Sequence, residues 1–216
     1  NIWDKLLDQK VFDLKIFFDK KSFNGIKSLS PDQLPYHKNK LLYLKNYSAF
    51  GIVYWQSRVI RECILSSFDK VIFLGEMNIL STWIACVVCK LKKKEIIFWT
   101  HGIYGKEGRI KSWLRVLFYK LADTFFVYEN RAKDLMIRKG FNKDIIHVVY
   151  NSLDFELQLQ IFNQLEKKNQ STQLQLFRNN LPTLFFIGRL TINKKIDQLI
   201  NASIILNKKN PSFNLL

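Results

Sequence analysis

Residues 96–108 read IIFWTHGIYGKEG, and this stretch decides the fold class. An apolar run of strand length ends at Trp99, and a glycine-rich loop follows it. A continuous apolar run, as opposed to an alternation of apolar and polar residues, is typical of a strand that is buried on both faces of a parallel sheet. The stretch therefore predicts a parallel strand that opens into a glycine-rich loop.

Further apolar runs of strand length lie on both sides of this stretch, at 14–18, 40–44, 71–74, 124–127 and 146–149. Helical patterns separate several of them, near 52–66, 79–91, 110–121 and 130–139. Strands that alternate with helices at this spacing are typical of βαβ units, whose strands are parallel. We therefore predict an α/β fold with a doubly wound, Rossmann-like parallel sheet.

A polar, glutamine-rich segment follows residue 155 and continues to residue 180, with helical spacing of Leu157, Ile161 and Leu165. Pro182 then precedes a new apolar run at 183–187. We predict a Rossmann-like domain over 1–155 that lacks its first strand, a connection over 156–182, and the first strand and helix of a second domain over 183–216. The chain begins inside a helical pattern at residues 2–7 and stops on an apolar run at 214–216, so we expect it to be part of a longer protein.

The chain is strongly basic, with 34 Lys and Arg against 18 Asp and Glu and a net charge of +16. Such an excess favours an anionic partner such as nucleic acid, an acidic membrane or a phosphorylated substrate. No helix-turn-helix, zinc-ligand or single-strand-binding signature accompanies it, so we expect no nucleic-acid partner. A basic nucleic-acid-binding module stays the main rival interpretation, and a compositional bias toward Lys, Asn and Ile would give the same charge without function.

The cysteines are Cys63, Cys86 and Cys89, an odd number that gives no disulfide framework and favours a reducing, cytoplasmic compartment. Cys86 and Cys89 have the spacing of a metal or redox motif, but they lie in an apolar helical segment without a second pair of ligands nearby. Buried structural thiols are therefore the favoured interpretation. The same apolar segment is shorter than the roughly 20 residues that cross a membrane.

The loop after the strand at 96–99 is the first candidate site, because ligands of open α/β sheets gather at the carboxyl ends of strands. Its glycines allow close approach of a ligand to the backbone, and the helix beyond them favours an anion. His101 can donate to a phosphate or sugar oxygen; the alternative is a turn with a hydrogen-bonded surface histidine. His37 and His147 are interpreted as structural.

The second candidate site is the loop after the apolar run at 183–187, which carries Gly188, Arg189 and Lys194. The guanidinium group of Arg189 offers a fork of donors, and Lys194 adds a point charge, which together suit a diphosphate. A helix that begins near Lys194 would add backbone donors.

Three segments, in this order along the chain, resemble glycosyltransferase family 4. The turn of residues 100–102, THG, resembles a turn of the family's acceptor domain, and residues 150–154, YNSLD, resemble its Asn-Gly-Val-Asp segment with Ser152 in place of glycine. Residues 188–190 (GRL), Lys194 and residues 196–200 (IDQLI) with Ala202 resemble the opening of its donor domain. The family usually has a glycine after that lysine, where this chain has Lys195. The resemblance covers most of the chain from about residue 70.

The resemblance implies a GT-B fold, with two facing Rossmann-like domains, and transfer of a sugar with retention from a nucleotide diphosphate sugar to a hydroxyl acceptor. It implies no required metal ion or cofactor. Gly188, Arg189 and Lys194 would hold the donor diphosphate, and His101 would lie near the transferring sugar. The glycine-rich loop residues that we expect at the active site are Gly102, Tyr104, Gly105 and Lys106, with Glu107 beside them.

The setting that the resemblance implies is synthesis of cell-surface polysaccharide or lipopolysaccharide, with a glycan or lipid-linked acceptor. Family members carry two glutamates deeper in the donor domain, so we expect the 216-residue chain by itself not to catalyse transfer. A non-catalytic Rossmann scaffold is a further rival interpretation.

The segment 109–120 mixes Arg109, Lys111 and Arg115 with aromatic residues. One face of this helix could lie on an anionic membrane, which would place the protein peripherally on the inner face of the membrane. The alternative is an ordinary helix that packs on the sheet and keeps its cations in solvent.

Overall fold

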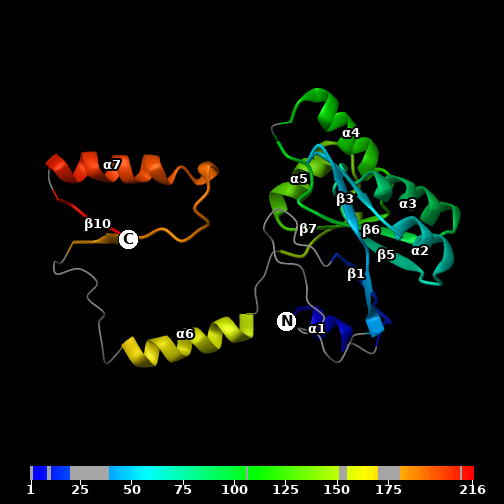
Figure 1. The fold of residues 1–216 in the computed structure, drawn as a ribbon, viewed down its shortest axis with the longest axis horizontal. Coiled ribbons are helices and arrows are strands. Elements are labelled where there is room, and N and C mark those ends of the chain that lie inside the picture. The colour runs from blue at the N-terminus through cyan, green and yellow to red at the C-terminus, as the bar shows by residue number, and fades with distance from the viewer. Residues whose placement is uncertain are drawn as a thin grey trace. The chain divides into compact units, whose positions relative to one another are not determined.

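The structure is a computed structural model that describes residues 2–8, 11–19, 39–105, 107–150, 155–169, 181–209 and 211–216. The chain divides into two compact units, Asn1–Phe155 and Glu156–Leu216. Figure 1 shows the elements of both units in chain order, from blue at the N-terminus to red at the C-terminus. The division falls beside the change in composition near residue 155.

A four-stranded parallel sheet forms the centre of the first unit. Its strands are β5 (Lys70–Leu74), β6 (Glu95–Thr100), β7 (Thr124–Val127) and β8 (Ile146–Val148), in that spatial order. These four strands were predicted from apolar runs, and the runs at 71–74, 96–99, 124–127 and 146–149 are confirmed as strands. The unit is a mixed α/β structure whose parallel sheet is flanked by helices, which is compatible with a Rossmann-like fold.

Helices connect these strands as the βαβ pattern predicts. Helix α3 (Leu80–Leu91) follows β5, α4 (Arg109–Tyr119) follows β6, and α5 (Asn130–Arg138) follows β7, with the short 3-10 helix η3 (Lys143–Ile145) before β8. Helix α2 (Val59–Leu65) precedes β5 and packs on α3. The helices predicted near 79–91, 110–121 and 130–139 are therefore confirmed.

The core lies between the sheet and these helices and is rich in aromatic rings. Phe98 of β6 stacks on Phe118 of α4, with 4.7 Å between ring centroids, and meets the ring of Phe125 of β7 edge-on at 6.1 Å. All three side chains are fully buried. Side chains alternate between the two faces of a strand, so Phe98 and Phe125 place the core on the helix-covered face.

The opposite face of the sheet is less covered. Ile72 and Leu74 of β5 are exposed among the described residues. The apolar runs predicted burial on both faces, and for β5 this prediction is wrong in the part of the chain that the structure describes. A run of apolar residues reports β-propensity as well as burial, and it cannot separate the two.

Two small sheets and helix α1 precede α2. Helix α1 (Ile2–Leu7) is followed by β1 (Ile16–Phe18), which pairs in parallel with β2 (Leu41–Tyr43), while β3 (Asn46–Ala49) and β4 (Val53–Gln56) form an antiparallel hairpin. The predicted helix near 52–66 is thus wrong over its first part. Phe50 and Gly51 have φ of 54° and 64°, the left-handed conformation that closes a tight hairpin, and the apolar residues after them continue as a strand.

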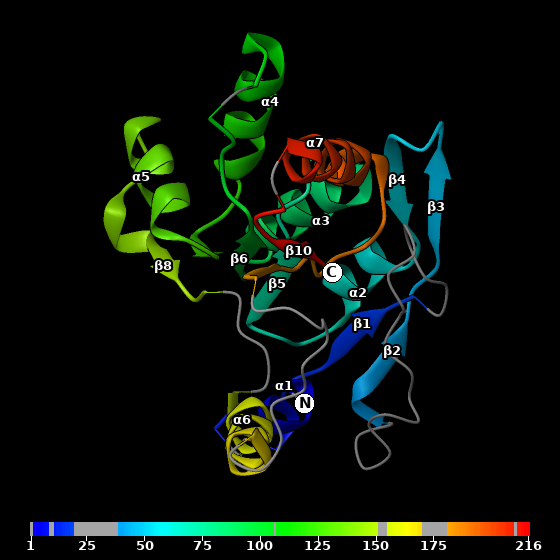
Figure 2. The ribbon, with the colours of Figure 1, turned by 90° about the vertical axis from the view of Figure 1, so that its left-hand side faces the viewer.

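The second unit contains a βαβ arrangement after helix α6 (Phe155–Asn169). Strand β9 (Thr183–Leu184) leads through the 3-10 helix η4 (Ile192–Lys194) and α7 (Ile196–Lys209) to β10 (Asn214–Leu215), which pairs in parallel with β9. Figures 1 and 2 show α7 along one side of this strand pair. The return to β10, which the sequence analysis did not predict, is held by the Asn207 side chain, which donates to the Phe213 carbonyl (2.9 Å) and accepts from the Ser212 amide (3.1 Å).

Candidate functional site

The carboxyl ends of β5, β6 and β7 lie at one edge of the sheet of the first unit. Their register pairs Leu74 with Trp99 and Thr100 with Val127, so the segments that follow the three strands leave the sheet at the same edge. This edge is where ligands bind in open α/β sheets. The predicted loop after β6 therefore has neighbours from both adjacent strands.

A buried pair of hydroxyl groups joins the end of β6 to the end of α4. The Thr100 and Tyr119 hydroxyl oxygens lie 2.8 Å apart, and both side chains are buried. The Tyr119 hydroxyl also lies 3.1 Å from the Gly102 carbonyl oxygen and 3.4 Å from that of Gly75, and the Thr100 hydroxyl accepts from the Gly102 amide at 3.2 Å. The end of β6, the turn after β5 and the last turn of α4 are thus tied together.

Two glycines are required in this arrangement. A Cβ on Gly75 would lie 2.6 Å from the Thr100 Cβ, a distance that real Cβ atoms do not reach. Gly102 has φ of +76°, and a Cβ there would lie 3.0 Å from the Cβ of Ala132 in α5. Gly102 was predicted as a site residue, and the structure shows it buried as a packing and turn residue. Gly75 was missed, although its place directly after the apolar run at 71–74 was a usable signal.

His101 is exposed on the loop after β6, at the edge where the prediction placed it. Its ring packs on Tyr128, which follows β7, with 4.6 Å between ring centroids. Tyr104 and Gly105 of the same loop are also exposed, whereas Lys106 lies outside the described residues. His147 is exposed in β8, and its ring meets Phe126 edge-on at 6.2 Å; His37 lies outside the described residues.

A carboxylate and three tyrosines give this edge its electrostatics. Burial raises the pKa of Tyr104, Tyr119 and Tyr128, and the negative charge of Glu76 raises each of them further. Glu76 follows β5 and is half-buried, and its carboxylate forms no ion pair among the described residues. The Tyr119 hydroxyl is used inside the protein, whereas Glu76, Tyr104, Tyr128 and His101 are at least partly exposed. These four combine an acceptor-only group, two neutral hydroxyls and an imidazole ring, which suits a ligand rich in hydroxyl groups.

A buried ion pair lies next to the loop that follows β6. The guanidinium group of Arg115 donates to both carboxylate oxygens of Glu107, at 2.9 and 2.7 Å, and the two side chains are only 6% and 5% exposed. Burial acts to lower the pKa of Arg115, but the hydrogen bonds and charge of Glu107 and the interaction with Tyr119 together outweigh it and leave that pKa raised. The guanidinium carbon lies 4.9 Å from the centre of the Tyr104 ring.

This pair corrects two expectations. Glu107 was expected beside the active-site loop as a ligand-contacting residue, but its side chain is 5% exposed and bound to Arg115. Arg115 was grouped with the outward cations of its helix, but its side chain points into the unit. Their spacing of eight residues crosses a loop and two helical turns, so no local sequence rule could pair them.

In the second unit, Gly188, Arg189 and Lys194 lie on the segment between β9 and α7, and all three are exposed. No carboxylate pairs with Arg189 or Lys194 in the described parts of the chain. A Cβ on Gly188 would lie 2.8 Å from the ring of Phe186. Lys195 follows Lys194 with φ of +53°, the left-handed conformation that favours glycine. These residues and the loop of His101 belong to different units.

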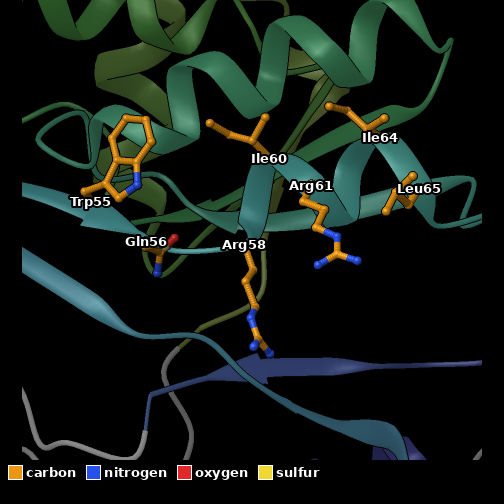
Figure 3. A pocket seen from close by; sticks show the side chains of 7 residues that line it. All are labelled: Trp55, Gln56, Arg58, Ile60, Arg61, Ile64 and Leu65. Atoms are coloured by element: carbon orange, nitrogen blue, oxygen red, sulfur yellow. The ribbon is translucent and has the colours of Figure 1, made fainter.

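A pocket in the described structure lies elsewhere, on β4 and α2. It has a volume of about 510 Å³ and is shown in Figure 3. Its lining residues are Trp55, Gln56, Arg58, Ile60, Arg61, Ile64 and Leu65. None of them is a predicted site residue, and they include no carboxylate, histidine or nucleophilic side chain.

The three cysteines are free and buried, as predicted. Within the described ranges no cluster of three potential metal ligands occurs, and no helix there combines the length and apolarity needed to cross a bilayer. No model of a known protein family matches this chain, and a search of curated proteins found no match either.

Proposed function

We propose that this chain belongs to a GT-B sugar transferase, in which the first unit binds the acceptor and the second binds a nucleotide diphosphate sugar. The observation that carries the proposal is the segment between β9 and α7. There Arg189 and Lys194 are exposed, have no carboxylate partner among the described residues, and precede the helix of a βαβ arrangement. Two unpaired cations at the carboxyl end of a parallel strand suit a diphosphate.

The conformation of Lys195 adds support. The sequences that this segment resembles have glycine at this position, and here the backbone adopts the left-handed conformation in which glycine is favoured. The local turn is therefore of the kind that the resemblance implies, although the side chain differs. This agreement concerns backbone geometry and is independent of the two cations.

The first unit supports an acceptor role through the edge that carries His101. The rings of His101 and Tyr128 pack against each other at a tilt of 47° and offer aromatic faces, and Glu76 offers hydroxyl-accepting oxygens. Sugars present apolar C–H faces and many hydroxyl groups, so such an edge matches their chemistry. The predicted glycine-rich loop contributes Tyr104 and Gly105 to the same surface.

The proposed reaction breaks the bond between the anomeric carbon of the sugar and the terminal diphosphate oxygen. A new bond forms on the same face between that carbon and an acceptor hydroxyl oxygen, and the hydroxyl proton passes to the departing diphosphate. Arg189 and Lys194 stabilise the charge that develops on the diphosphate, and His101 orients the sugar or the acceptor. The acceptor is a glycan or a lipid-linked sugar, and the protein acts on the cytoplasmic side of a membrane without a cofactor or metal ion.

The test measures consumption of UDP-, GDP-, ADP- and dTDP-sugars by the natural protein, with a membrane extract as the source of acceptor. Changing both Arg189→Ala and Lys194→Ala is expected to lower turnover of the active donor by about 10²–10³-fold, because charge on the leaving group is no longer stabilised. Lys208→Ala, which removes an exposed cation of α7, is the matched control and should leave turnover unchanged.

Normal consumption by the double variant would contradict the proposal. So would a natural protein that consumes none of the four donors but shifts an oligonucleotide in a gel in a salt-sensitive way, which is the behaviour of a nucleic-acid-binding module.

A further inference from the structure

Helix α4 has two apolar faces, and only one of them is used by the core. Phe118 and Tyr119 point inward and are fully buried. The other face consists of Ile110, Trp113, Leu114 and Leu117, which are 78%, 63%, 38% and 43% exposed. We call these four residues the outer stripe. Their spacing of three, four and seven residues aligns them along the helix.

Cations border the outer stripe on both sides. At 3.6 residues per turn, Arg109 and Lys120 lie along one side of it and Lys111 along the other. Arg109 and Lys120 have no carboxylate partner among the described residues, and the Lys111 ammonium group lies 3.9 Å from Glu107, whose closer partner is Arg115. The helix therefore presents an apolar strip with a positive border.

The inward anchors of α4 hold this strip in place. The Arg115–Glu107 ion pair fixes its middle, and the Tyr119 hydroxyl fixes its end. The first turns of α4 also extend beyond the other helices of the first unit in both views (Figures 1 and 2). The strip is thus a rigid, outward surface of a folded unit.

The neighbouring helices lack this combination. Helix α5 carries charged residues on its exposed side, among them Arg131, Asp134 and Arg138. Helix α3 also exposes apolar residues, but its lysines lie at its C-terminal end and not along its sides. There Lys90 is paired with Asp123 at 3.0 Å, and Lys92 and Lys94 donate to the backbone carbonyl groups of residues 64 and 66. The charge pattern therefore singles out α4.

We infer that the outer stripe of α4 is a docking surface for an anionic membrane, on which the helix lies parallel to the bilayer. An amphipathic helix with Trp and Leu on one face and Lys or Arg beside them binds at the level of the lipid headgroups. The inference does not depend on sugar transfer, because it uses no residue assigned to the transferred sugar or its donor. It replaces the expectation that Arg115 takes part in such binding.

The test is co-sedimentation of the 216-residue chain with vesicles of phosphatidylcholine mixed with phosphatidylglycerol, and with vesicles of phosphatidylcholine alone. The chain should bind the anionic vesicles far better, and rising salt should weaken the binding. The double change Trp113→Ser with Leu117→Ser should lower the partition coefficient about tenfold or more, because two exposed apolar side chains can no longer enter the headgroup region.

The matched control is Val87→Ser with Leu91→Ser, which removes two exposed apolar side chains from α3 and should leave binding unchanged. Arg109→Glu with Lys111→Glu should abolish the preference for anionic lipid. Trp113→Phe should bind normally yet lose much of the fluorescence quenching by brominated lipid chains, which tests contact even if the serine variants fold poorly.

Equal loss in the α3 control, or normal binding by the α4 double variant with an unchanged circular dichroism spectrum, would overturn the inference. So would a chain that fails to bind anionic vesicles but forms a dimer that the α4 double variant dissociates, since the stripe would then be covered by a second copy.

Discussion

At the scale of single residues, the structure depends on a few polar groups buried at the end of the sheet. The Tyr119 hydroxyl is the centre of them, because it contacts the Thr100 hydroxyl and lies within reach of the carbonyl groups of Gly75 and Gly102. A buried polar group that loses its partner retains the cost of its desolvation. These contacts therefore have consequences for stability that can be measured.

Tyr119→Phe is expected to lower the free energy of unfolding by about 1–3 kcal/mol, because the Thr100 hydroxyl loses one hydrogen-bond partner and the Gly102 carbonyl loses a donor at 3.1 Å. Denaturant unfolding followed by circular dichroism measures it. Tyr54→Phe is the control, since the Tyr54 hydroxyl donates to the Gly51 carbonyl at an exposed position and its loss should cost less than about 0.5 kcal/mol. Equal costs in the two variants would show that the buried hydroxyl has no special role.

Glu107→Gln should lower the free energy of unfolding more, by about 3–5 kcal/mol, because it leaves the buried Arg115 charge without its counter-ion. Lys111→Gln, which removes the exposed cation at 3.9 Å from the same carboxylate, is the comparison and should cost almost nothing. A small loss for Glu107→Gln would mean that solvent reaches Arg115.

At the scale of elements, the sequence predicts the strands and helices of the four-stranded parallel sheet well. The helices and strands of the βαβ units follow from long periodic or apolar segments, for which local pattern and tertiary structure agree. The hairpin of β3 and β4 was missed because its turn depends on Phe50 in a left-handed conformation, which is uncommon for a residue other than glycine. The strand β10 was missed because two residues are too few for any periodicity.

The candidate site was predicted in outline only. Strand-end position located His101 and its loop, because that rule concerns topology. The partners Tyr128, Glu76 and Tyr119 come from other elements, and only folding brings them to this edge. Sequence spacing carries no information on such contacts, which also explains why the Arg115–Glu107 pair was not foreseen.

The packing of α2 against α3 makes a prediction for the thiols between them. A hydrogen bond to Cys89 and burial raise the pKa of Cys63, and burial raises that of Cys86; the same hydrogen bond lowers the pKa of Cys89, which is nevertheless fully buried. We expect no reaction with an aromatic disulfide reagent at pH 8 in the native chain and complete reaction in denaturant. Rapid modification of the native chain would contradict this packing.

At the scale of the whole chain, the two units differ in how much they bury. The first contains the aromatic core, whereas in the described part of the second the only buried residue is Ser203. Most of the stability of a unit comes from buried apolar surface. The units should therefore differ in stability when the chain is studied by itself.

Hydrogen exchange read by mass spectrometry checks this difference. Amides of β6 and β7 should stay protected for hours, while those of α7 should exchange within minutes, because Ser203 is the one buried residue among the described side chains of α7. A nucleoside diphosphate that binds through Arg189 and Lys194 should slow exchange in α7 and leave β6 unaffected. Strong protection of α7 in the unliganded chain would show that the second unit is stabilised by contacts outside the described residues.

The hydroxyl of Tyr119 also has a mechanical consequence. It belongs to the last residue of α4 and contacts the backbone of the loop after β6, so the helix and that loop turn as one body. If α4 lies on a lipid surface, the orientation of the helix relative to the bilayer also sets the orientation of the loop. The His101 edge would then be held at a constant distance and angle from the bilayer surface, facing any molecule embedded in the same leaflet in one orientation.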